Sequence, residues 1–267
     1  MPLLHLVLIA VIQGLTEFLP ISSSGHLILL PGLTGMQDQG QMIDVSVHVG
    51  TLFAVVLYFR KDVALAFAGL GRLLRGKVDT LGARLAMGLI ASTGPVMAVG
   101  FILHATGLDQ ALRSVAVIGW TMLIFGLVLY WADQKGAEAK TIVDWRFRDA
   151  ITMGLWQAVA LIPGTSRSGI TITGGRLLGY TREEAARVAM LMSIPTILAS
   201  GALLGLDVVE AGDWSGAQDA ALAAGLAFVA ALLALAAMMR LTRRISFTPY
   251  VIYRVILGVA LLVYAYT

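Results

Sequence analysis

Residues 13–26 read QGLTEFLPISSSGH, and residues 163–169 read PGTSRSG. Both polar segments interrupt apolar sequence that is long enough to lie in a membrane. A carboxylate, a histidine and an arginine are costly to bury at such a depth, and they usually mark a functional site there. The serines, threonines and glycines beside them supply hydroxyl groups and backbone amides that a ligand can approach closely. This combination indicates a site for a phosphate group inside a membrane protein.

The composition excludes an ordinary soluble domain. Of the 267 residues, 58% are hydrophobic and 13% are charged, whereas soluble domains carry about 25% charged residues. The chain has no cysteine, which excludes a disulfide framework, thiolate chemistry and a zinc–thiolate site. The first twelve residues are apolar but lack a basic leader and a small-residue cleavage site, so we do not expect a removable signal peptide.

Six segments contain the roughly 20 mostly apolar residues that a membrane-spanning helix needs. They are 42–59, 84–103, 114–131, 185–206, 217–239 and 249–266. Two further apolar regions, 3–33 and 149–180, are interrupted by Pro20 and Pro163 and by the serines and glycines that follow them. We interpret each as two half-helices joined at a break, which is tolerated at membrane depth only where protein or a wet cavity surrounds it. We therefore predict an all-α integral membrane protein with six transmembrane helices.

Loop charges predict the orientation of these helices. Residues 60–83 carry five basic and two acidic residues, and residues 240–244 carry three arginines. The segment 207–219 carries four acidic residues and no basic one. Because basic loops tend to face the cytoplasm, both basic segments are placed inside and both termini outside.

This orientation makes the two broken regions enter the membrane from opposite sides. The chain would then be a single membrane domain of two inverted halves, 1–135 and 136–267, each with one re-entrant helix-loop-helix hairpin and three spans. A weak echo, in which residues 20–25 align with residues 163–168, supports the repeat. Inverted repeats with broken helices place a site near the membrane midplane, between the halves.

The first segment has the residues for acid–base chemistry. Gln13 and Glu17 are four residues apart and share one helix face. Pro20 ends that helix, and the serines 22–24 then lie at a helix N-terminus, which favours an anion. The serines could instead serve only as caps. His26 follows Ser23 within one helical turn, where proton exchange between them is plausible.

The second polar segment and the predicted span 42–59 add charged groups. Arg167 can hold a phosphate through two parallel hydrogen bonds, or it can form a bridge to Glu17 that joins the two halves. Asp44, His48 and Thr51 lie on or near one helical stripe. Their side chains either line the outer opening of the site or serve as polar partners for one another.

At these residues the chain resembles the BacA-type undecaprenyl pyrophosphate phosphatases, over nearly its whole length. Residues 17–26 resemble the first signature of that family and residues 163–169 the second, while Asp44, His48, Gly50 and Thr51 fit a weaker pattern. The resemblance implies an enzyme that removes the terminal phosphate of undecaprenyl pyrophosphate and so regenerates the lipid carrier of cell-wall precursors. It implies a bacterial inner (plasma) membrane and a divalent cation, magnesium or calcium. The loop charges predict that the site opens to the outer, periplasmic side.

The resemblance also implies roles for individual residues. The catalytic residues would be Glu17, Ser23, His26 and Arg167. From the residue types around them, we ourselves expect the substrate-binding residues to be Gln13, Ser22, Ser24, Gly25, Asp44, His48, Gly164, Thr165, Ser166 and Ser168. Gln13 occupies a position where the family can have glutamate, and an amide is a weaker metal ligand. We therefore expect the metal on Glu17 and the substrate phosphates. The attacking group is either Ser23, which we favour, or a water molecule.

Two other functions fit part of the pattern. Inverted repeats with a midplane site are typical of transporters, so the chain could move a lipid phosphate across the bilayer instead of, or besides, hydrolysing it. Residues 24–26 fit part of the signature of acid-phosphatase-type lipid phosphatases, but the Lys/Arg-Pro segment expected before it is missing. We expect a polyprenyl pyrophosphate lipid and the bilayer as partners, no nucleic acid, and leave a homo-oligomer open.

Overall fold

The computed structural model describes residues 2–23, 25–27, 30, 35, 40–211 and 216–267; for residues 109–110, 203–204 and 206–211 it describes the backbone alone. All regular elements in this part of the chain are helices. Six of them are long and apolar enough to cross a membrane, and they coincide with the six predicted spans.

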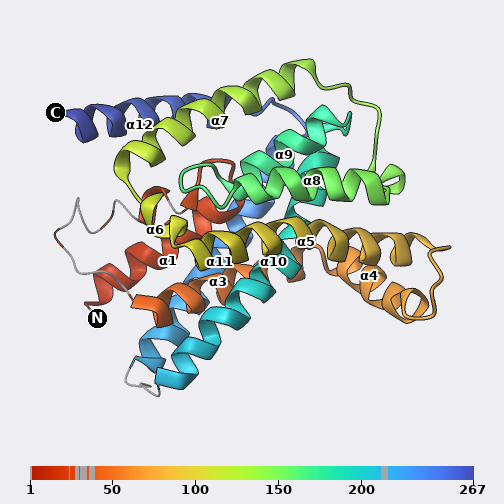
Figure 1. Cartoon of the computed structure of the whole chain (residues 1–267), viewed down its shortest axis with the longest axis horizontal. Helices are drawn as coiled ribbons and strands as arrows, with labels where there is room; N and C mark the ends of the chain where they lie inside the picture. The colour runs from red at the N-terminus through yellow and green to blue at the C-terminus, as the bar shows by residue number, and fades with distance from the viewer. Residues whose placement is uncertain (1, 24, 28–29, 31–34, 36–39, 212–215) are drawn as a thin grey trace.

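The six candidate spans are α3 (Gly40–Tyr58), α5 (Leu81–Thr106), α7 (Val115–Lys135), α10 (Arg182–Ala211), α11 (Ala217–Leu241) and α12 (Thr248–Tyr266) (Figure 1). The other elements are α1 (Leu3–Phe18), α4 (Arg60–Leu73), α6 (Leu108–Ala111), the 3-10 helix η1 (Ile142–Asp144), α8 (Phe147–Val159) and α9 (Arg167–Leu177). The second interrupted region is therefore two short helices, α8 and α9, joined by a turn.

Local signals explain several helix boundaries. Thr80 precedes α5, and its hydroxyl accepts a hydrogen bond from the amide of Ala83 at 3.2 Å. Ser114 caps α7 in the same way through the amide of Val117. Gly107 ends α5 with a left-handed φ of 70°, a conformation that glycine adopts without steric cost.

The two halves of the sequence pack reciprocally. Helix α1 packs against α11, which comes from the second half, while α8 packs against α5, which comes from the first half. Both contacts rely on a glycine. A Cβ on Gly14 of α1 would lie 2.6 Å from the Cβ of Ala230, and one on Gly154 of α8 would lie 2.5 Å from the carbonyl oxygen of Ser92. The helix backbones therefore approach closely at both places.

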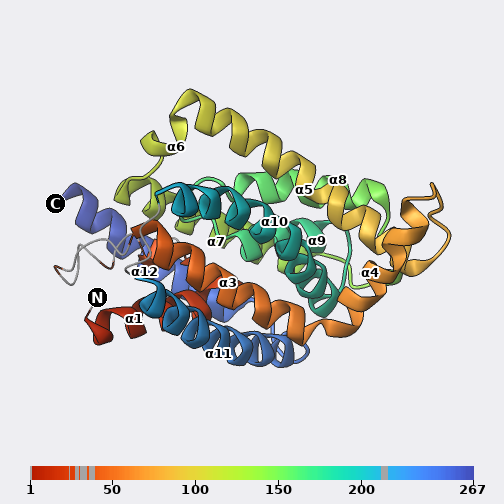
Figure 2. The same ribbon diagram turned by 90° about the horizontal axis from the view of Figure 1, so that it is seen from below.

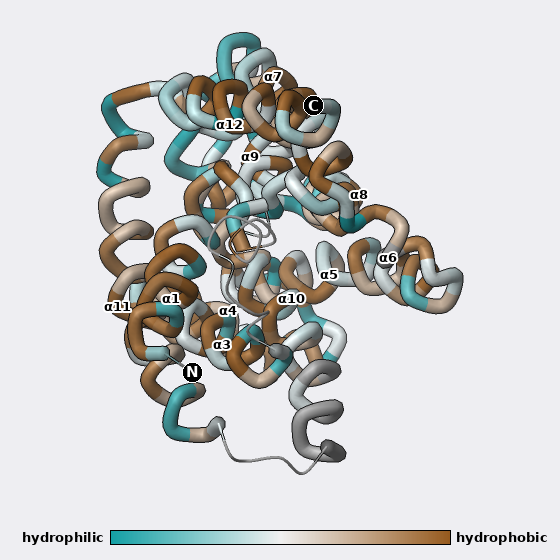
Figure 3. The backbone as a smooth tube through the Cα atoms, turned by 90° about the vertical axis from the view of Figure 1, so that its left-hand side faces the viewer, coloured by the Kyte–Doolittle hydropathy of each residue, from teal (hydrophilic) through white to brown (hydrophobic). Residues whose placement is uncertain are grey.

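The ends of the molecule differ in what they carry. Both termini lie at the left end in Figures 1 and 2, and α4 with the turn after it lies at the right end. The basic segment 60–83 is thus at the end opposite to the termini, as the loop charges predict. Figure 3 shows hydrophobic residues, in brown, along much of the long helices, as expected for helices that lie in a bilayer.

Candidate active site

The two polar breaks meet in space. Arg167, the first residue of α9, donates through Nη2 to Oε1 of Glu17 near the end of α1, at 2.5 Å. Both side chains are largely buried, with 15% and 7% of their surfaces exposed. The hydroxyl of Ser168 donates to the backbone oxygen of Leu19 at 2.9 Å. Segments 150 residues apart along the chain therefore form one site.

The first break begins because of a proline. Leu19 precedes Pro20 and has an extended conformation, with φ −67° and ψ 142°, since a residue before proline is disfavoured in the helical region. The backbone then turns sharply at Ser22, whose φ is 75°. In the second break, Gly164 and Ser166 have φ values of 85° and 70°.

Each break closes with the same serine cap. The hydroxyl of Ser22 accepts from the amide of Gly25 at 3.4 Å, and the hydroxyl of Ser166 accepts from the amide of Gly169 at 3.2 Å. By their caps, Ser22 therefore corresponds to Ser166, whereas the alignment of residues 20–25 with residues 163–168 placed Ser22 over Thr165. That alignment is shifted by one residue, because the proline precedes the serine with positive φ by two residues in the first break and by three in the second.

Glu17 is the centre of the site. Its Oε2 accepts from the side-chain amide of Gln13 at 2.9 Å and from the hydroxyl of Ser23 at 2.8 Å. Its Oε1 accepts from Arg167. Three of the four residues expected to be catalytic are thus joined through one carboxylate.

His26 has different partners from those expected. Its Nδ1 lies 2.6 Å from the backbone oxygen of Ser22, and its Nε2 lies 2.5 Å from the hydroxyl of Tyr253 on α12. The hydroxyl of Ser23 is hydrogen-bonded to Glu17. The short distance in sequence made proton exchange between Ser23 and His26 plausible, but the hydrogen bonds of these two side chains go to other partners. Side chains of residues within one turn can point in different directions around the helix axis.

Three buried polar atoms beside the Glu17–Arg167 pair lack a hydrogen-bond partner among the described residues. They are Oε1 of Gln13, Oγ1 of Thr165 and Nη1 of Arg167. Leaving such atoms unpaired is costly, and they demand an explanation. One acceptor, one hydroxyl and one cationic donor are available here to a ligand with several oxygens.

Arg254 is a buried residue that the sequence analysis did not single out. It lies in α12 with none of its surface exposed. Its guanidinium donates to the backbone oxygens of Pro20 at 3.4 Å and of Gly164 at 3.2 Å, and also to those of Thr121 and Met122 on α7. It therefore ties both breaks to α7. The available signal was an arginine in the middle of an apolar span.

The other predicted residues lie in the breaks or on α3, and one lies outside the described residues. Ser166 and Ser168 are joined through their hydroxyls at 3.1 Å. Asp44 lies one turn before His48 on α3, and its backbone oxygen is 2.7 Å from Nδ1 of His48. Ser24 lies outside the part of the chain that the structure describes.

The residues present suit a divalent cation only in part. The described residues contain no group of three or more His, Asp or Glu side chains placed to hold a metal. The site offers one carboxylate, Glu17, and one unpaired amide oxygen, Oε1 of Gln13. Magnesium often binds through one or two protein oxygens and completes its shell with phosphates and water. These donors therefore fit a cation that is shared with a phosphate ligand.

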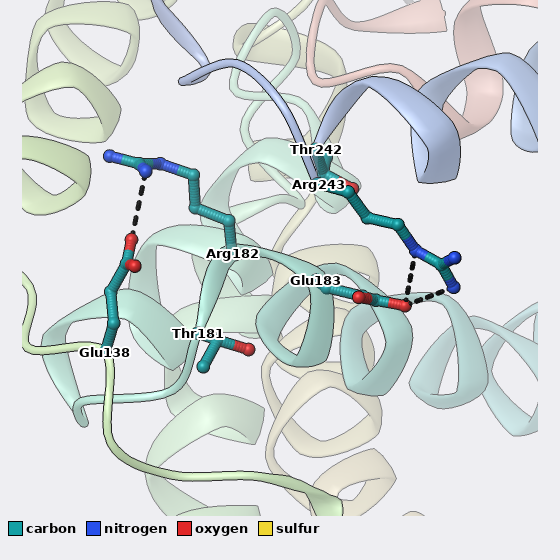
Figure 4. Close-up of a pocket in the computed structure, with 6 residues that line it drawn as sticks. All are labelled: Glu138, Thr181, Arg182, Glu183, Thr242 and Arg243. Carbon is teal, nitrogen blue, oxygen red and sulfur yellow. Dashed lines mark hydrogen bonds and ion pairs between the residues drawn. The ribbon is translucent and has the colours of Figure 1, made fainter.

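A separate polar pocket of about 600 Å³ lies at the turns before η1, between α9 and α10, and between α11 and α12 (Figure 4). Its lining residues are Glu138, Thr181, Arg182, Glu183, Thr242 and Arg243. Arg182 pairs with Glu138 at 3.0 Å and Arg243 with Glu183 at 2.6 Å. This pocket contains none of the residues predicted for the site, and its two arginines already have carboxylate partners.

Known proteins resemble the chain over its whole length. The family model described as "Bacitracin resistance protein BacA" matches residues 6–260. A Dinoroseobacter shibae protein named undecaprenyl-diphosphatase is 70% identical over 267 residues, which is all of both chains. Proteins of the same name from Ruegeria pomeroyi and Chromohalobacter salexigens are 66% and 48% identical, over 100% and 98% of both chains.

Proposed function

The chain belongs to the BacA family, and on this premise we propose that it hydrolyses undecaprenyl pyrophosphate to undecaprenyl phosphate and inorganic phosphate. It is a multi-pass membrane protein with six candidate spans. One observation carries the proposed chemistry: the buried Glu17–Arg167 pair adjoins a serine hydroxyl and several unpaired polar atoms. A pyrophosphate supplies acceptor oxygens for the two donors among these atoms, Oγ1 of Thr165 and Nη1 of Arg167.

Arg167 holds the terminal phosphate. Its Nη2 is bound to Glu17, and its buried Nη1 is free of partners in the described chain, so one guanidinium faces both the base and the substrate. The hydroxyl of Thr165 is a second donor. Charge-assisted bonds to an anion are about twice as strong as neutral ones. Phosphoryl transfer depends mainly on such placement and charge neutralisation.

Ser23 is the attacking group. Its hydroxyl already donates to Glu17 at 2.8 Å, within the range that a general base requires. Glu17 takes the proton as Oγ bonds to the terminal phosphorus. The bridging P–O bond breaks, and its electron pair leaves with undecaprenyl phosphate. Water then hydrolyses the phosphoserine, which releases inorganic phosphate and restores the serine.

His26 exchanges a proton with a phosphate oxygen. Its ring is bound to Ser22 and Tyr253, so the geometry does not make it the base for Ser23. An imidazole can donate or accept a proton near neutral pH, which suits a group that serves two successive transfers. We assign it the proton that the leaving phosphate or the second-step water exchanges.

A divalent cation would be held by Glu17, Oε1 of Gln13 and the substrate phosphates. When bound, it would supply positive charge against the phosphate oxygens. The cation would share Glu17 with Arg167 and would need the substrate phosphates to complete its shell. Gln13 also orients Glu17 through its amide nitrogen, whether or not a cation is bound.

We also propose that the breaks belong to two re-entrant hairpins of an inverted repeat, with halves 1–135 and 136–267. The reciprocal packing of α1 on α11 and α8 on α5 supports this, as do the matching caps at Ser22 and Ser166. With the basic segments inside, the site opens to the outer side of the inner membrane.

The same packing favours a second candidate, a transporter of lipid phosphates, since reciprocal halves around a central site are transporter architecture. One experiment separates the two. Purified protein in detergent, which has no second compartment, is given a polyprenyl pyrophosphate, and inorganic phosphate is measured. Hydrolysis predicts release by the wild type and loss in Arg167→Ala. No release by wild type with cation present would reject the phosphatase.

A further inference from the structure

His26 is held from two sides. The Nδ1 contact is to the backbone of Ser22, and the Nε2 contact is to the hydroxyl of Tyr253. The rings of His26 and Tyr253 are also stacked, with centroids 5.7 Å apart and planes inclined by 7°. Tyr253 lies 227 residues further along the chain, on α12. A helix from the far end of the sequence therefore supplies a polar group to the first break.

These contacts determine where the imidazole carries its proton. A carbonyl oxygen only accepts hydrogen bonds, so Nδ1 of His26 must be the donor to Ser22. In the neutral ring the lone pair is then on Nε2, and the phenol of Tyr253 donates to it. The partner of one ring nitrogen sets the state of the other. Tyr253 therefore engages the Nε2 lone pair, and this hydrogen bond must open when His26 exchanges a proton with a phosphate oxygen.

Packing alone does not account for this side chain. Tyr253 is 42% exposed, so packing covers only part of its surface. The neighbouring Arg254 already anchors α12, because its guanidinium is bonded to backbone oxygens of α7 and of both breaks. The position of α12 therefore does not depend on the Tyr253 ring, whereas the orientation of His26 does.

We propose that Tyr253 is a positioning residue that acts through His26, holding the imidazole in one orientation and one tautomer for phosphoryl transfer. The inference rests on the proposed function, since it assigns Tyr253 to that reaction. The torsion that turns an imidazole ring is broad and roughly two-fold. Two hydrogen bonds and a stacked ring restrict it, which raises the fraction of molecules in which the proton is placed correctly.

Kinetics of three variants test the assignment. Tyr253→Phe keeps the stacked ring and loses the hydroxyl; we expect kcat to fall about tenfold, the lower end for losing a partner that orients a histidine. KM should stay within about twofold, because Arg167 still binds the phosphate. Tyr253→Leu loses ring and hydroxyl and should lower kcat further. Tyr264→Phe, on the same helix at a site 64% exposed, should behave as wild type.

Nitrogen-15 NMR of histidine-labelled protein in detergent gives a readout that needs no turnover. The chain has four histidines, and His26→Asn identifies the His26 signals by their loss. We expect a protonated Nδ1 and a hydrogen-bonded Nε2 in the wild type, and a displaced Nε2 signal in Tyr253→Phe but not in Tyr264→Phe.

The combined results decide the proposal. Unchanged His26 signals in Tyr253→Phe would overturn it, whatever happens to kcat, because Tyr253 would then act by packing only. A displaced signal with wild-type kcat would overturn it as well. If the wild type releases no phosphate, the proposed function fails, and a displaced signal still supports the control of His26 by Tyr253.

Discussion

Ser22 and Ser166 adopt the same rare backbone conformation, with φ values of 75° and 70°, and each accepts a hydrogen bond from the glycine amide three residues later. Apart from these two serines, all residues with a positive φ in the described part of the chain are glycines. A positive φ is uncommon outside glycine and is often stored at functional sites. The two serines turn the backbone so that Ser23 and Arg167 begin the helices that follow.

Substitution at Ser166 separates the cap from the backbone strain. Ser166→Gly loses the hydroxyl but accepts the positive φ, whereas Ser166→Ala loses the hydroxyl and keeps the strain. We expect Ser166→Ala to be less stable than Ser166→Gly by about 1 kcal/mol, as for alanine in a left-handed conformation. Thermal unfolding in detergent measures the difference. Equal stabilities would show that φ at residue 166 relaxes freely.

Arg254 should be essential for stability. Arg254→Met leaves four backbone oxygens without their donor, and hydrogen bonds to charged groups contribute about 1.5–3 kcal/mol each. Taking a net loss of about 3 kcal/mol, we expect Tm to fall by about 6–12 °C. The control is Arg244→Met, an exposed arginine in the turn after α11. A wild-type Tm for Arg254→Met would contradict the role of this residue in joining the breaks.

Ser23→Ala distinguishes a serine nucleophile from an attacking water. We expect loss of turnover with substrate binding retained, because Arg167 and Thr165 still meet the phosphate. Ser46→Ala is the control, since that hydroxyl bonds back to its own helix, at the oxygen of Met42. Substantial residual turnover in Ser23→Ala would mean that a water attacks, with Glu17 as its base.

Chelation and substitution of Gln13 test the cation. We expect a chelator to lower phosphate release by the wild type, and Gln13→Glu to reach half-maximal activity at a lower cation concentration, because it adds a second carboxylate. Gln13→Ala should cost less activity than Arg167→Ala. Activity that resists the chelator in both wild type and Gln13→Glu would remove the cation from the mechanism.

Local sequence patterns predicted the helical elements well. Hydropathy located the six spans, and Pro20 and Pro163 with their neighbouring serines located the breaks, because these properties act within one helix or turn. The proximity of the breaks followed from chemistry, since a buried acid and a buried arginine each need a partner. The orientation of the two breaks in the membrane stays a prediction.

Long-range partners could not be predicted in the same way. Tyr253 and Arg254 lie in an apolar span with no polar motif around them, so nothing local linked them to residues more than 200 positions earlier. The hydrogen bond from Ser23 to Glu17 could not be predicted either, because it depends on how the chain folds back at the break between them.

The central claim is that Glu17 and Arg167 form one hydrolytic unit, and a double-mutant cycle tests it most directly. Phosphate release in detergent is compared for wild type, Glu17→Ala, Arg167→Ala and the double variant. We expect each single change to lower kcat by about 10²–10³, as for loss of one transition-state donor. Because the pair acts as a unit, the double variant should be about as slow as the slower single one. Losses that multiply in the double variant, or a single variant that retains wild-type turnover, would contradict the account.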